Sequence, residues 1–497
     1  MRNLITILSI ALVTNLYPQS PDVFISERMS GETNFGRSVG HNDEFYFALR
    51  IENEDGGRRA YIDSRSKADL SLAHSIPVNV PLENAESFSI EELVFGDKDL
   101  LIFYSFFSKK DDQRTLAVSS LDGATGAVGG AHKVHSEPGK HESRTGKYLI
   151  EHHVGSGKTT VLITHPPEGR IAADYGYLSP EFEVIQLGTD LQVDHQGRGE
   201  MSDKPFNAVN SLFVSKSGDV YFLLELKHKV ASYDHSSGTT SRAEIPELTK
   251  EELKIYGDHS YPYFSEAPNG NVYLFKPSGL TKLGGSTNIA GMQVISFDPS
   301  NCAFTGAKFF PMQTRDIFTK GDTKNKFPPA LFHISGAATW WNTKNELMLG
   351  MTHQRLEGYT TYVEHTVITS FDPEIGWGPV YFHELPQTLS MTQTEIGSTI
   401  FVPDGDQAYL MTMDYIGNAG SDPKPRRLMP KEMDAEGLVP MVVHFDGSGF
   451  GPREPAMESP TRPPYRAKPW MMDKVEHESI LILHIKDEKR LMRITAP

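Results

Sequence analysis

The sequence of 497 residues contains a single cysteine, Cys302, and only four tryptophans. One cysteine excludes an intrachain disulfide, so the fold must be held by packing and hydrogen bonds alone. No Asn-x-Ser or Asn-x-Thr acceptor for glycosylation occurs either. In an exported chain of this size, these absences fit a bacterial product better than a eukaryotic one.

Basic side chains are fewer than acidic ones, 48 against 64, and the formal net charge is −16. Nucleic-acid binding depends on Lys and Arg side chains that neutralise phosphates. The sequence has no dense run of Lys and Arg. We therefore predict that the protein has no nucleic-acid partner.

Long apolar runs are absent after the first twenty residues. There, Arg2 precedes an apolar stretch over residues 4–13, and polar and turn-forming residues including Pro18 follow, which is the layout of a secretory signal. The stretch is shorter than the roughly 20 residues needed to cross a bilayer as a helix. We predict a signal peptide over residues 1–20, no membrane span, and secretion or export to the periplasm, most simply of a bacterium.

No catalytic signature is complete. The nearest is HHVGSGKTT at residues 152–160, but a phosphate-binding loop needs glycine where His152 stands and a helix after Lys158. β-Branched residues follow Lys158 instead, and Pro166-Pro167 comes soon after. The pattern predicts a β-hairpin with its turn at residues 155–157. The sequence has no H-E-x-x-H frame on a helix.

The sequence is rich in pairs of short apolar strands separated by a Gly, Asn or Asp turn. Such pairs occur at residues 41–47, 93–103, 148–163, 212–223, 263–275, 340–349, 400–411 and 475–485. A second recurring element is an apolar strand that ends in Asp and a turn. It occurs at residues 118–123, 230–235, 294–299, 367–373 and 442–447, with a looser relative at 185–190. The Asp carboxylate suits this place because it accepts backbone NH groups of the turn.

Helical patterning is confined to residues 245–255. A chain of short strands repeating at roughly 60-residue intervals is typical of a β-propeller, whose small sheets are stable only against one another. We predict one all-β domain over residues 21–497, with eight blades narrowly preferred over seven. The last sheet would recruit residues 22–26 from the start of the mature chain. Two β-sandwich domains are the alternative.

Long inserts rich in Pro and charge occur at residues 423–440 and 452–469, and apolar alternation lapses over 312–329. We predict loops there, gathered at one rim, where ligands usually meet a propeller.

Two short stretches resemble known propeller repeats. Residues 121–126 (LDGATG) are similar to the L-D-x-x-T-G turn of quinoprotein dehydrogenase propellers, without the tryptophan that follows there. Residues 370–377 (SFDPEIGW) resemble the Asp-box of sialidases, with the glycine displaced by two positions. In layout, the whole chain resembles uncharacterised secreted bacterial proteins of the β-propeller repeat type. These resemblances imply a propeller and no particular chemistry.

The densest histidine cluster is predicted to be the metal site, if any exists. His132, His135 and His141 lie within ten residues, and imidazoles on one loop are suitable ligands for Zn²⁺. A solvated loop without metal is the alternative. Acidic turns at residues 53–57 and 404–406 would be the candidates for Ca²⁺. We predict no cofactor beyond such a Ca²⁺ or Zn²⁺ ion.

Trp340 and Trp341 form the most unusual aromatic pair. Adjacent side chains of a strand face opposite ways, so one indole would enter the core and the other would stack on a ligand. We therefore select Trp340 and Trp341 as the ligand-binding residues. The sequence favours an exported, non-enzymatic binding or scaffold module whose partner is a protein or glycan. The alternative is a carbohydrate-active hydrolase or lyase with carboxylates converging on the propeller channel.

Overall fold

The computed structural model of the chain divides it into two compact units. Unit 1 comprises Met1–Glu32 and Leu331–Pro497, and unit 2 comprises Thr33–Ala330. The structure describes residues 22–26, 36–54, 57–78, 85–95, 100–108, 110–138, 147–153, 157–165, 179–200, 209–215, 218, 220–224, 229–234, 237–245, 248–257, 262–280, 289–298, 303–312, 334–357, 360–390, 399–420, 425–427, 429, 438–456, 465–471, 478–485 and 488–496. The predicted signal peptide, Cys302 and His141 lie outside these ranges.

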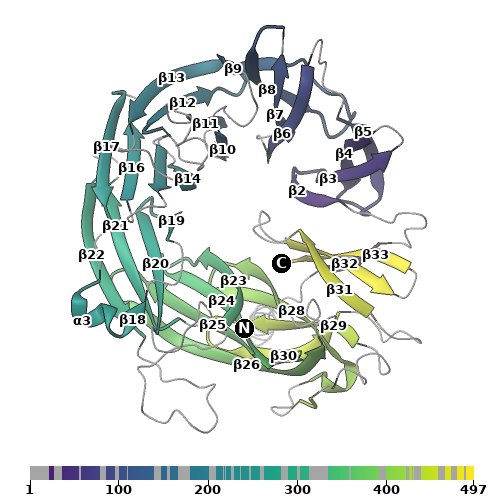
Figure 1. Cartoon of the computed structure of the whole chain (residues 1–497). Coiled ribbons are helices and arrows are strands. Elements are labelled where there is room, and N and C mark those ends of the chain that lie inside the picture. Colours follow the sequence, from purple (N-terminus) through teal and green to yellow (C-terminus); the bar gives the residue numbers. More distant parts are fainter. Residues whose placement is uncertain are drawn as a thin grey trace, which may run out of the picture. The chain divides into compact units, whose positions relative to one another are not determined.

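Unit 2 is built from five antiparallel sheets in chain order. Their strands are β2 (Arg37–His41), β3 (Phe45–Glu54), β4 (Gly57–Ser66) and β5 (Leu72–Pro77); β6 (Ala85–Phe95), β7 (Leu100–Ser108), β8 (Gln113–Leu121) and β9 (His132–Pro138); β10 (Lys147–His153), β11 (Lys158–Thr164), β12 (Glu181–Leu187) and β13 (Val193–Glu200); β14 (Val209–Val214), β15 (Val220–Leu224), β16 (Lys229–Asp234) and β17 (Thr239–Glu244); and β18 (Tyr256–Gly257), β19 (Tyr263–Glu266), β20 (Val272–Leu280), β21 (Gly291–Asp298) and β22 (Ala303–Pro311). Figure 1 shows these sheets following one another within the unit.

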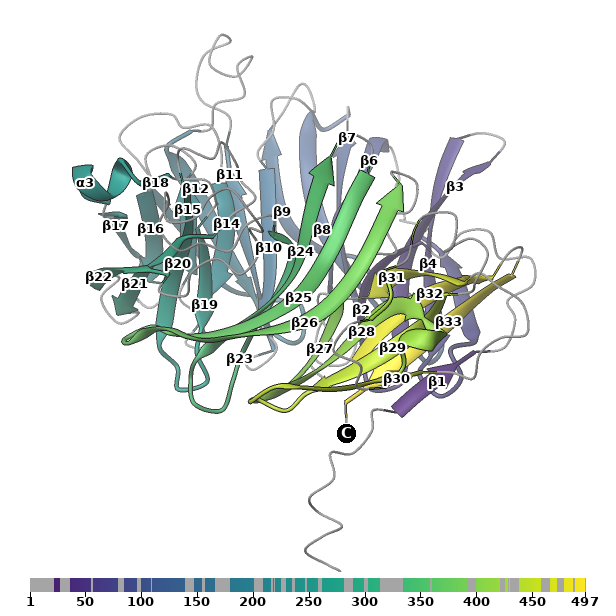
Figure 2. The same cartoon turned by 90° about the horizontal axis from the view of Figure 1, so that it is seen from below.

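Unit 1 contains three further sheets. Their strands are β23 (Ile334–Trp341), β24 (Leu347–Glu357), β25 (Thr360–Asp372) and β26 (Gly376–Ser390); β27 (Ile400–Asp404), β28 (Gln407–Tyr415), β29 (Leu438–Phe445) and β30 (Phe450–Pro455); and β31 (Tyr465–Met471), β32 (Glu478–Ile485), β33 (Glu488–Thr495) and β1 (Asp22–Ile25). The long strands β24, β25 and β26 are prominent in Figure 2. Four-stranded meanders are the units of a propeller, so the all-β prediction is confirmed and the chain has a β-propeller layout.

The start of the described chain completes its last sheet, as predicted. Strand β1 pairs antiparallel with β33, with Asp22 opposite Thr495 and Ile25 opposite Met492. The hydroxyl of Ser26 extends the pairing by accepting from the backbone nitrogen of Leu491 at 2.9 Å. The N-terminal strand is therefore held by residues more than 460 positions away along the chain.

Neighbouring sheets within a unit bury apolar faces against each other. Between the β6–β9 and β10–β13 sheets, Phe103 and Val118 pack in one buried cluster with Ile163 and Ile185. First strands of successive sheets also contact one another, β2 with β6, β6 with β10 and β10 with β14. Each sheet therefore shields the next, which is why the short strands are stable.

Glycine allows the closest of these approaches. In β2, Gly40 has a φ of +145° and faces Phe95 of β6, whose ring an added Cβ would overlap. In β13, a Cβ on Gly197 would overlap the hydroxyl of Tyr233, which belongs to the next sheet. The Tyr233 hydroxyl lies 2.9 Å from Nε2 of His195. A larger side chain at Gly197 would therefore separate the two sheets.

Local predictions have mixed outcomes. The HHVGSGKTT stretch contains the β10–β11 hairpin, with His153 opposite Lys158, so the hairpin is confirmed. The predicted helix is real but short: α3 spans Lys250–Leu253 and starts with a capping box of Thr249 and Glu252. The loops predicted over 423–440 and 452–469 are both wrong in part. Strand β29 begins at Leu438, β30 extends to Pro455 and β31 begins at Tyr465. Strand β31 accommodates Pro469 at a shift in register.

The Asp turns are confirmed where their side chains are described. Asp122, Asp372 and Asp446 each follow or end the third strand of a sheet and accept backbone NH groups of the turn. Asp446 accepts from the nitrogens of Ser448 and Gly449 at 2.8 and 2.9 Å. These hydrogen bonds lower the pKa of the Asp446 carboxyl, with the Ser448 amide as the largest cause.

Candidate functional site

The structure separates the roles of Trp340 and Trp341 at the end of β23. Trp340 is 9% exposed and its ring lies 6.4 Å from that of Phe401. Its indole nitrogen donates to the carbonyl oxygen of Gly405 at 3.1 Å. Trp340 therefore belongs to the core between the β23–β26 and β27–β30 sheets, and little of it is left for a ligand. Trp341 is half-buried, and its stacking on a ligand stays a prediction.

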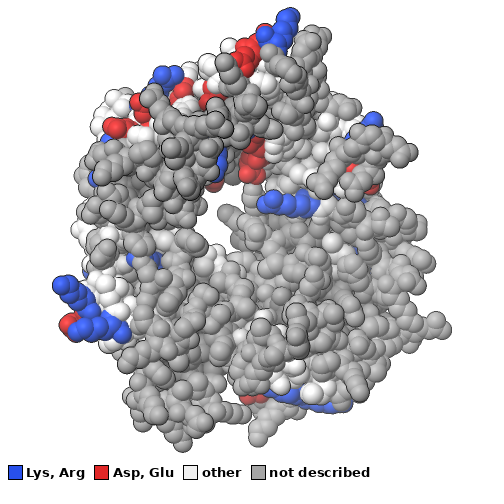
Figure 3. Space-filling view, in the orientation of Figure 1, with Lys and Arg blue, Asp and Glu red and all other residues white. Residues whose placement is uncertain are grey.

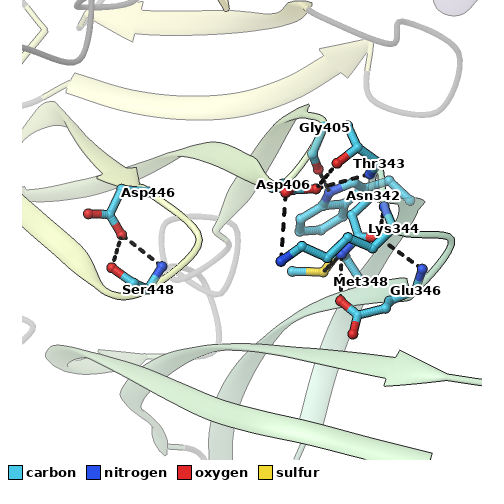
Figure 4. A network of polar contacts seen from close by, with 10 residues as sticks. Asn342, Thr343, Lys344, Glu346, Met348, Gly405, Asp406, Asp446 and Ser448 are labelled. Atoms are coloured by element: carbon cyan, nitrogen blue, oxygen red, sulfur yellow. Dashed lines mark hydrogen bonds and ion pairs between the residues drawn. The ribbon is translucent and has the colours of Figure 1, made fainter. Parts of the chain in front are cut away.

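The β23–β24 turn is tied to the next sheet by the network in Figure 4. Thr343 donates to Oδ1 of Asp406 through its backbone nitrogen, at 3.0 Å, and its hydroxyl, at 2.7 Å. Lys344 Nζ lies 4.0 Å from Oδ2 of the same carboxylate. The acidic turn at 404–406, a candidate for Ca²⁺, thus uses Asp406 to join two hairpins.

The structure does not bring His132 and His135 together. His132 Nδ1 lies 3.0 Å from the side-chain nitrogen of Gln192, whereas His135 Nδ1 lies 3.9 Å from Oε1 of Glu183. Among the described residues, no group of three or more His, Cys, Asp or Glu side chains is arranged to hold a metal ion. With His141 outside the described ranges, the zinc site of His132, His135 and His141 stays a prediction.

His135 instead belongs to a polar cluster at one edge of the β6–β9 and β10–β13 sheets. We call it the rim cluster and define it as Glu91, Arg114, His135, Glu137, Tyr148, His165, Glu183 and Arg198. Most of these residues lie where β8, β10 and β12 begin and where β9, β11 and β13 end. Successive strands of a meander run in opposite directions, so these ends share one edge. In the view of Figure 3, both acidic and basic side chains occur on the described surface of the protein.

One end of the rim cluster is a guanidinium held between a carboxylate and a phenol ring. Arg114 Nη2 donates to Glu91 Oε1 at 2.8 Å, and Ser105 donates its hydroxyl to the same oxygen. The Arg114 guanidinium carbon lies 4.8 Å from the centre of the Tyr148 ring. This cation–π contact crosses from the β6–β9 sheet to the β10–β13 sheet and fixes the position of Tyr148.

The middle of the rim cluster is a carboxylate next to two imidazoles. Glu137 Oε2 lies 3.3 Å from Nδ1 of His165, and the two side chains are 11% and 28% exposed. The His135 and His165 rings lie 6.5 Å apart. Burial, the largest cause, and the nearby Glu137 raise the pKa of the Tyr148 phenol. Tyr148 therefore keeps its proton across the physiological range.

The other end of the rim cluster contains a buried carboxylate. Glu183, whose side chain is 1% exposed, stands opposite Arg198 in the sheet, with Oε2 3.5 Å from Arg198 Nε. The side chain of Gln196 donates to its other oxygen, Oε1. Glu183 Oε2 has no hydrogen-bond partner, and neither does Nε2 of His135. Buried polar atoms in native proteins are usually satisfied by protein, water or ligand, so a water molecule or a ligand group can serve as the partner of these two atoms.

Burial also decides the charge of His135. Desolvation lowers the pKa of this imidazole, Glu183 and Glu137 oppose the shift, and His165 and Arg198 add to it. The imidazole is therefore neutral near pH 7. A neutral imidazole and a carboxylate oxygen both accept hydrogen bonds, so the rim cluster favours a ligand rich in hydroxyl or amide donors.

Unit 1 has a second histidine cluster between its β23–β26 and β27–β30 sheets. We call it the core cluster and define it as His353, His365, His383, Asp414 and Arg453. His353 and His365 stack with ring centres 5.8 Å apart, and Asp414 Oδ2 lies 3.8 Å from Arg453 Nε. Burial is the main cause that lowers the pKa of His383 to about 3 and raises that of Asp414 to about 6.

The two clusters differ in access to solvent. In the core cluster, Asp414 and Arg453 are 1% and 5% exposed, and His383 is 7% exposed. In the rim cluster, the side chains of His165 and Arg198 are 28% and 81% exposed. A ligand can therefore reach His165 and Arg198 at the surface of the rim cluster, and we take the rim cluster as the candidate functional site.

Sequence reasoning identified one member of this site, His135, and assigned it a different role. Glu183 had a detectable signal, because it is a charged residue inside the buried strand EFEVIQL and such residues are rarely buried without a reason. Tyr148 and His165 had none, since their contacts depend on how two sheets pack.

Comparisons with known proteins give no family. No protein-family model and no curated protein matches the chain. Among solved structures it is similar to the polysaccharide lyase Uly1, with 11% identity, a TM-score of 0.36 and coverage of 85% of this chain and 93% of that one. It is also similar to the β-propeller domain of the Trilobed protease from Pyrococcus furiosus. The identity is 9%, the TM-score is 0.34, and the match covers 82% of this chain and 94% of that one. A protein of unknown function from Bacteroides caccae is similar with 8% identity and a TM-score of 0.28, and the match covers 67% of this chain and 93% of that one. Likenesses this low carry no conclusion about activity.

Proposed function

We propose that the chain is an exported β-propeller protein that binds a glycan at the rim cluster, with each of the eight sheets of the described residues serving as one blade. The carrying observation is that two buried acceptor atoms, Glu183 Oε2 and His135 Nε2, lack a hydrogen-bond partner beside side chains that solvent reaches. A buried polar atom left in this state costs about 1–3 kcal/mol. A ligand hydroxyl that donates to it recovers that free energy.

A glycan fits these atoms better than a protein ligand does. Sugar hydroxyls present several donors at short spacing, whereas protein recognition depends mainly on buried aromatic and Arg anchors. Of the residues that the structure describes, those in the rim cluster with open surface are charged or polar, as Arg198 and His165 are. Among the described residues, no helix is both long and apolar enough to span a bilayer.

Binding to an array of oligosaccharides, followed by calorimetry on the best ligand, tests the proposal. Glu183→Met and His135→Leu replace each acceptor with an apolar side chain of comparable size, and we expect each to weaken binding about tenfold, or about 1.4 kcal/mol. Lys254→Ala is the matched control because Lys254, which follows the last residue of α3, forms an exposed ion pair with Glu251 of that helix. Absence of glycan binding, or equal affinity of all four proteins, would contradict the proposal. Thermal unfolding establishes that each variant is folded.

The alternative is a carbohydrate-active hydrolase or lyase. It predicts a change in the oligosaccharide during incubation, which mass spectrometry of the recovered ligand detects. If binding or turnover depends on Ca²⁺ or Zn²⁺, removal of the ion with a chelator would abolish it.

A further inference from the structure

The β31–β33 sheet receives its fourth strand from a distant part of the chain. Strand β33 pairs with β32 over its whole length, from Glu478 opposite Thr495 to Ile485 opposite Glu488. Its other edge is covered by β1, and among the described strands β1 pairs with β33 alone. The edge that β1 covers is therefore built by β32 and β33, without a contribution from β1.

One face of β1 fits the apolar core of unit 1. Val23 and Ile25 pack against a buried cluster that includes Met492 and Ile494 of β33. The register places Val23 opposite Ile494 and Ile25 opposite Met492. Because removal of β1 would expose these apolar side chains to water, the edge of β33 has a driving force to bind a strand with this pattern.

The opposite face of β1 contacts one cation. Phe24 lies opposite Arg493, and the guanidinium carbon of Arg493 lies 5.5 Å from the centre of the Phe24 ring. Arg493 Nη2 also lies 3.7 Å from Oδ2 of Asp22. A carboxylate followed two residues later by an aromatic ring therefore suits this edge, because both groups attract a guanidinium.

Ser26 fixes the end of the pairing. Its backbone nitrogen donates to the carbonyl oxygen of Leu491 at 2.9 Å, and its hydroxyl accepts from the backbone nitrogen of Leu491 at 2.9 Å. A slip by one residue would turn Val23 and Ile25 to the other face of the sheet. The sequence Asp-Val-Phe-Ile-Ser therefore specifies one register on this edge.

Strand β1 is a short addition to unit 1, and the chain that follows it continues into unit 2. The strand has four residues against eight in β33, and Asp22 is exposed while the three residues after it are half-buried. Residues up to Glu32 belong to unit 1, and residues from Thr33 belong to unit 2. Only the contacts of one short strand hold β1 in its sheet, and the same strand of another copy makes the same contacts.

We propose that the edge of β33 is a strand-acceptor site that takes β1 from a second copy of this chain as well as from its own. The product of the exchange is a dimer in which each β1 completes the last sheet of the other copy. Strands β1 and β33 both belong to unit 1. The interface therefore shares no residue with the rim cluster of unit 2, and the inference does not rest on glycan binding.

Cysteines placed in separate copies test the exchange. Cys302, the single cysteine of the chain, is first replaced by serine, and Val23→Cys and Ile494→Cys are then introduced into two different full-length proteins. The pair of Val23 and Ile494 lies three steps along the ladder from the hydrogen-bonded pair of Ser26 and Leu491. It is therefore a non-hydrogen-bonded pair with Cα atoms about 4.5 Å apart, a distance that a disulfide spans.

The two proteins are mixed, incubated in urea below the unfolding midpoint, returned to buffer and oxidised. We expect a disulfide-linked dimer whose share rises with protein concentration. Val23→Cys mixed with Thr495→Cys is the matched control, because Thr495 follows Ile494 and faces the other side of the sheet. This control should give about tenfold less dimer, since its cysteine side chains point apart. Val23→Cys and Ile494→Cys in one chain, at low concentration, should close the disulfide within that chain.

Each other result contradicts the exchange. Absence of the mixed dimer at every concentration overturns it, and so does a dimer that forms equally with Thr495→Cys, because that dimer identifies a contact elsewhere on the surface. Failure of the double variant to close its own disulfide also overturns it, because the pairing of β1 with β33 would then be wrong. Sedimentation of the unaltered chain after the same urea treatment gives a readout without substitutions: a dimer is expected, and monomer alone contradicts the proposal.

Discussion

The rim cluster of unit 2 and the core cluster of unit 1 place the same residue type in opposite electrostatic surroundings. His135 in β9 and His383 in β26 both lie on the fourth strand of a sheet, and burial lowers the pKa of both. Carboxylates of Glu183 and Glu137 oppose the shift at His135, whereas Arg453 and His365 add to the shift at His383. The largest charge effect on the His135 imidazole favours its protonation, whereas both nearby charged groups at His383 resist protonation.

The difference indicates that burial alone does not define a functional site. In the core cluster, burial is nearly complete and the charges of Asp414 and Arg453 face each other. Such pairs specify packing and are costly to break. In the rim cluster, the buried acceptors adjoin solvent-exposed Arg198 and His165, so desolvated groups and access to ligand occur together.

The largest expected effect is the loss of Arg453. Arg453→Met leaves Asp414 buried without its counter-charge, and removing one partner of a buried pair costs about 3–5 kcal/mol. Arg198→Met is the matched change in the rim cluster, where an exposed side chain contributes less than about 1 kcal/mol. Urea unfolding of the two variants at neutral pH measures both. Equal costs would show that the clusters do not differ in the way described.

The next effect is on the pH dependence of stability, which the two residues of the core cluster affect in opposite directions. The pKa of His383 is lowered from 6.5 to about 3 in the fold. The contribution of the neutral His383 side chain to the free energy of unfolding is therefore complete above pH 6.5 and is lost as the pH falls from 6.5 towards 3. The pKa of Asp414 is raised from 3.8 to about 6, so the fold gains stability as the pH falls from 6 to 3.8. Each unit of pKa shift corresponds to about 1.4 kcal/mol.

Acidification from pH 6.5 to 5 should therefore lower the free energy of unfolding of His383→Asn by about 2 kcal/mol less than that of the unaltered chain. Asp414→Asn should make the free energy of unfolding fall more steeply with decreasing pH. His135→Asn should change the slope less than His383→Asn, because carboxylates offset the desolvation of His135. Unfolding midpoints at several pH values give the three slopes. A steeper acid loss in His383→Asn than in the unaltered chain would reverse the assignment.

How much of the fold the sequence reveals depends on which strand of a sheet is considered. Third strands are found because an apolar run ends in an Asp turn, as at Asp122 and Asp446. In the sheet β2–β5, β4 ends at Ser66 and the Asp of its turn, Asp69, lies three residues further on, so the pattern is missed. Strand β31 was hidden because Pro469 and charged neighbours mask its strand pattern. Fourth strands such as β13 alternate between exposed and half-buried positions, which gives a weaker signal than an apolar run.

The site was less accessible to sequence reasoning than the fold. A charge inside an apolar strand identifies Glu183 in EFEVIQL and Asp414 in YLMTMDY, and this signal was available. The partners of Glu183 and the approach of His165 to Glu137 were not, because these residues come from different strands with no fixed spacing. Clustered histidines suggested a metal at His132 and His135, but neighbours in sequence contact different partners in the sheet.

The smallest expected effect concerns the Asp turns, where the two units should behave alike. Asp446→Ala in unit 1 removes a carboxylate that accepts from Ser448 and Gly449, at a cost of about 1 kcal/mol. Asp446→Asn, which keeps an acceptor, should cost less. Asp122→Ala in unit 2 should lower the unfolding midpoint in the same direction, because Asp122 accepts from the nitrogens of Ala124 and Thr125. Parallel changes in the two units, measured in the same urea series as Arg453→Met, would show that the repeat stabilises every sheet alike. A clear difference between Asp446→Ala and Asp122→Ala would instead show that the two units differ in their Asp turns as well as in their histidine clusters.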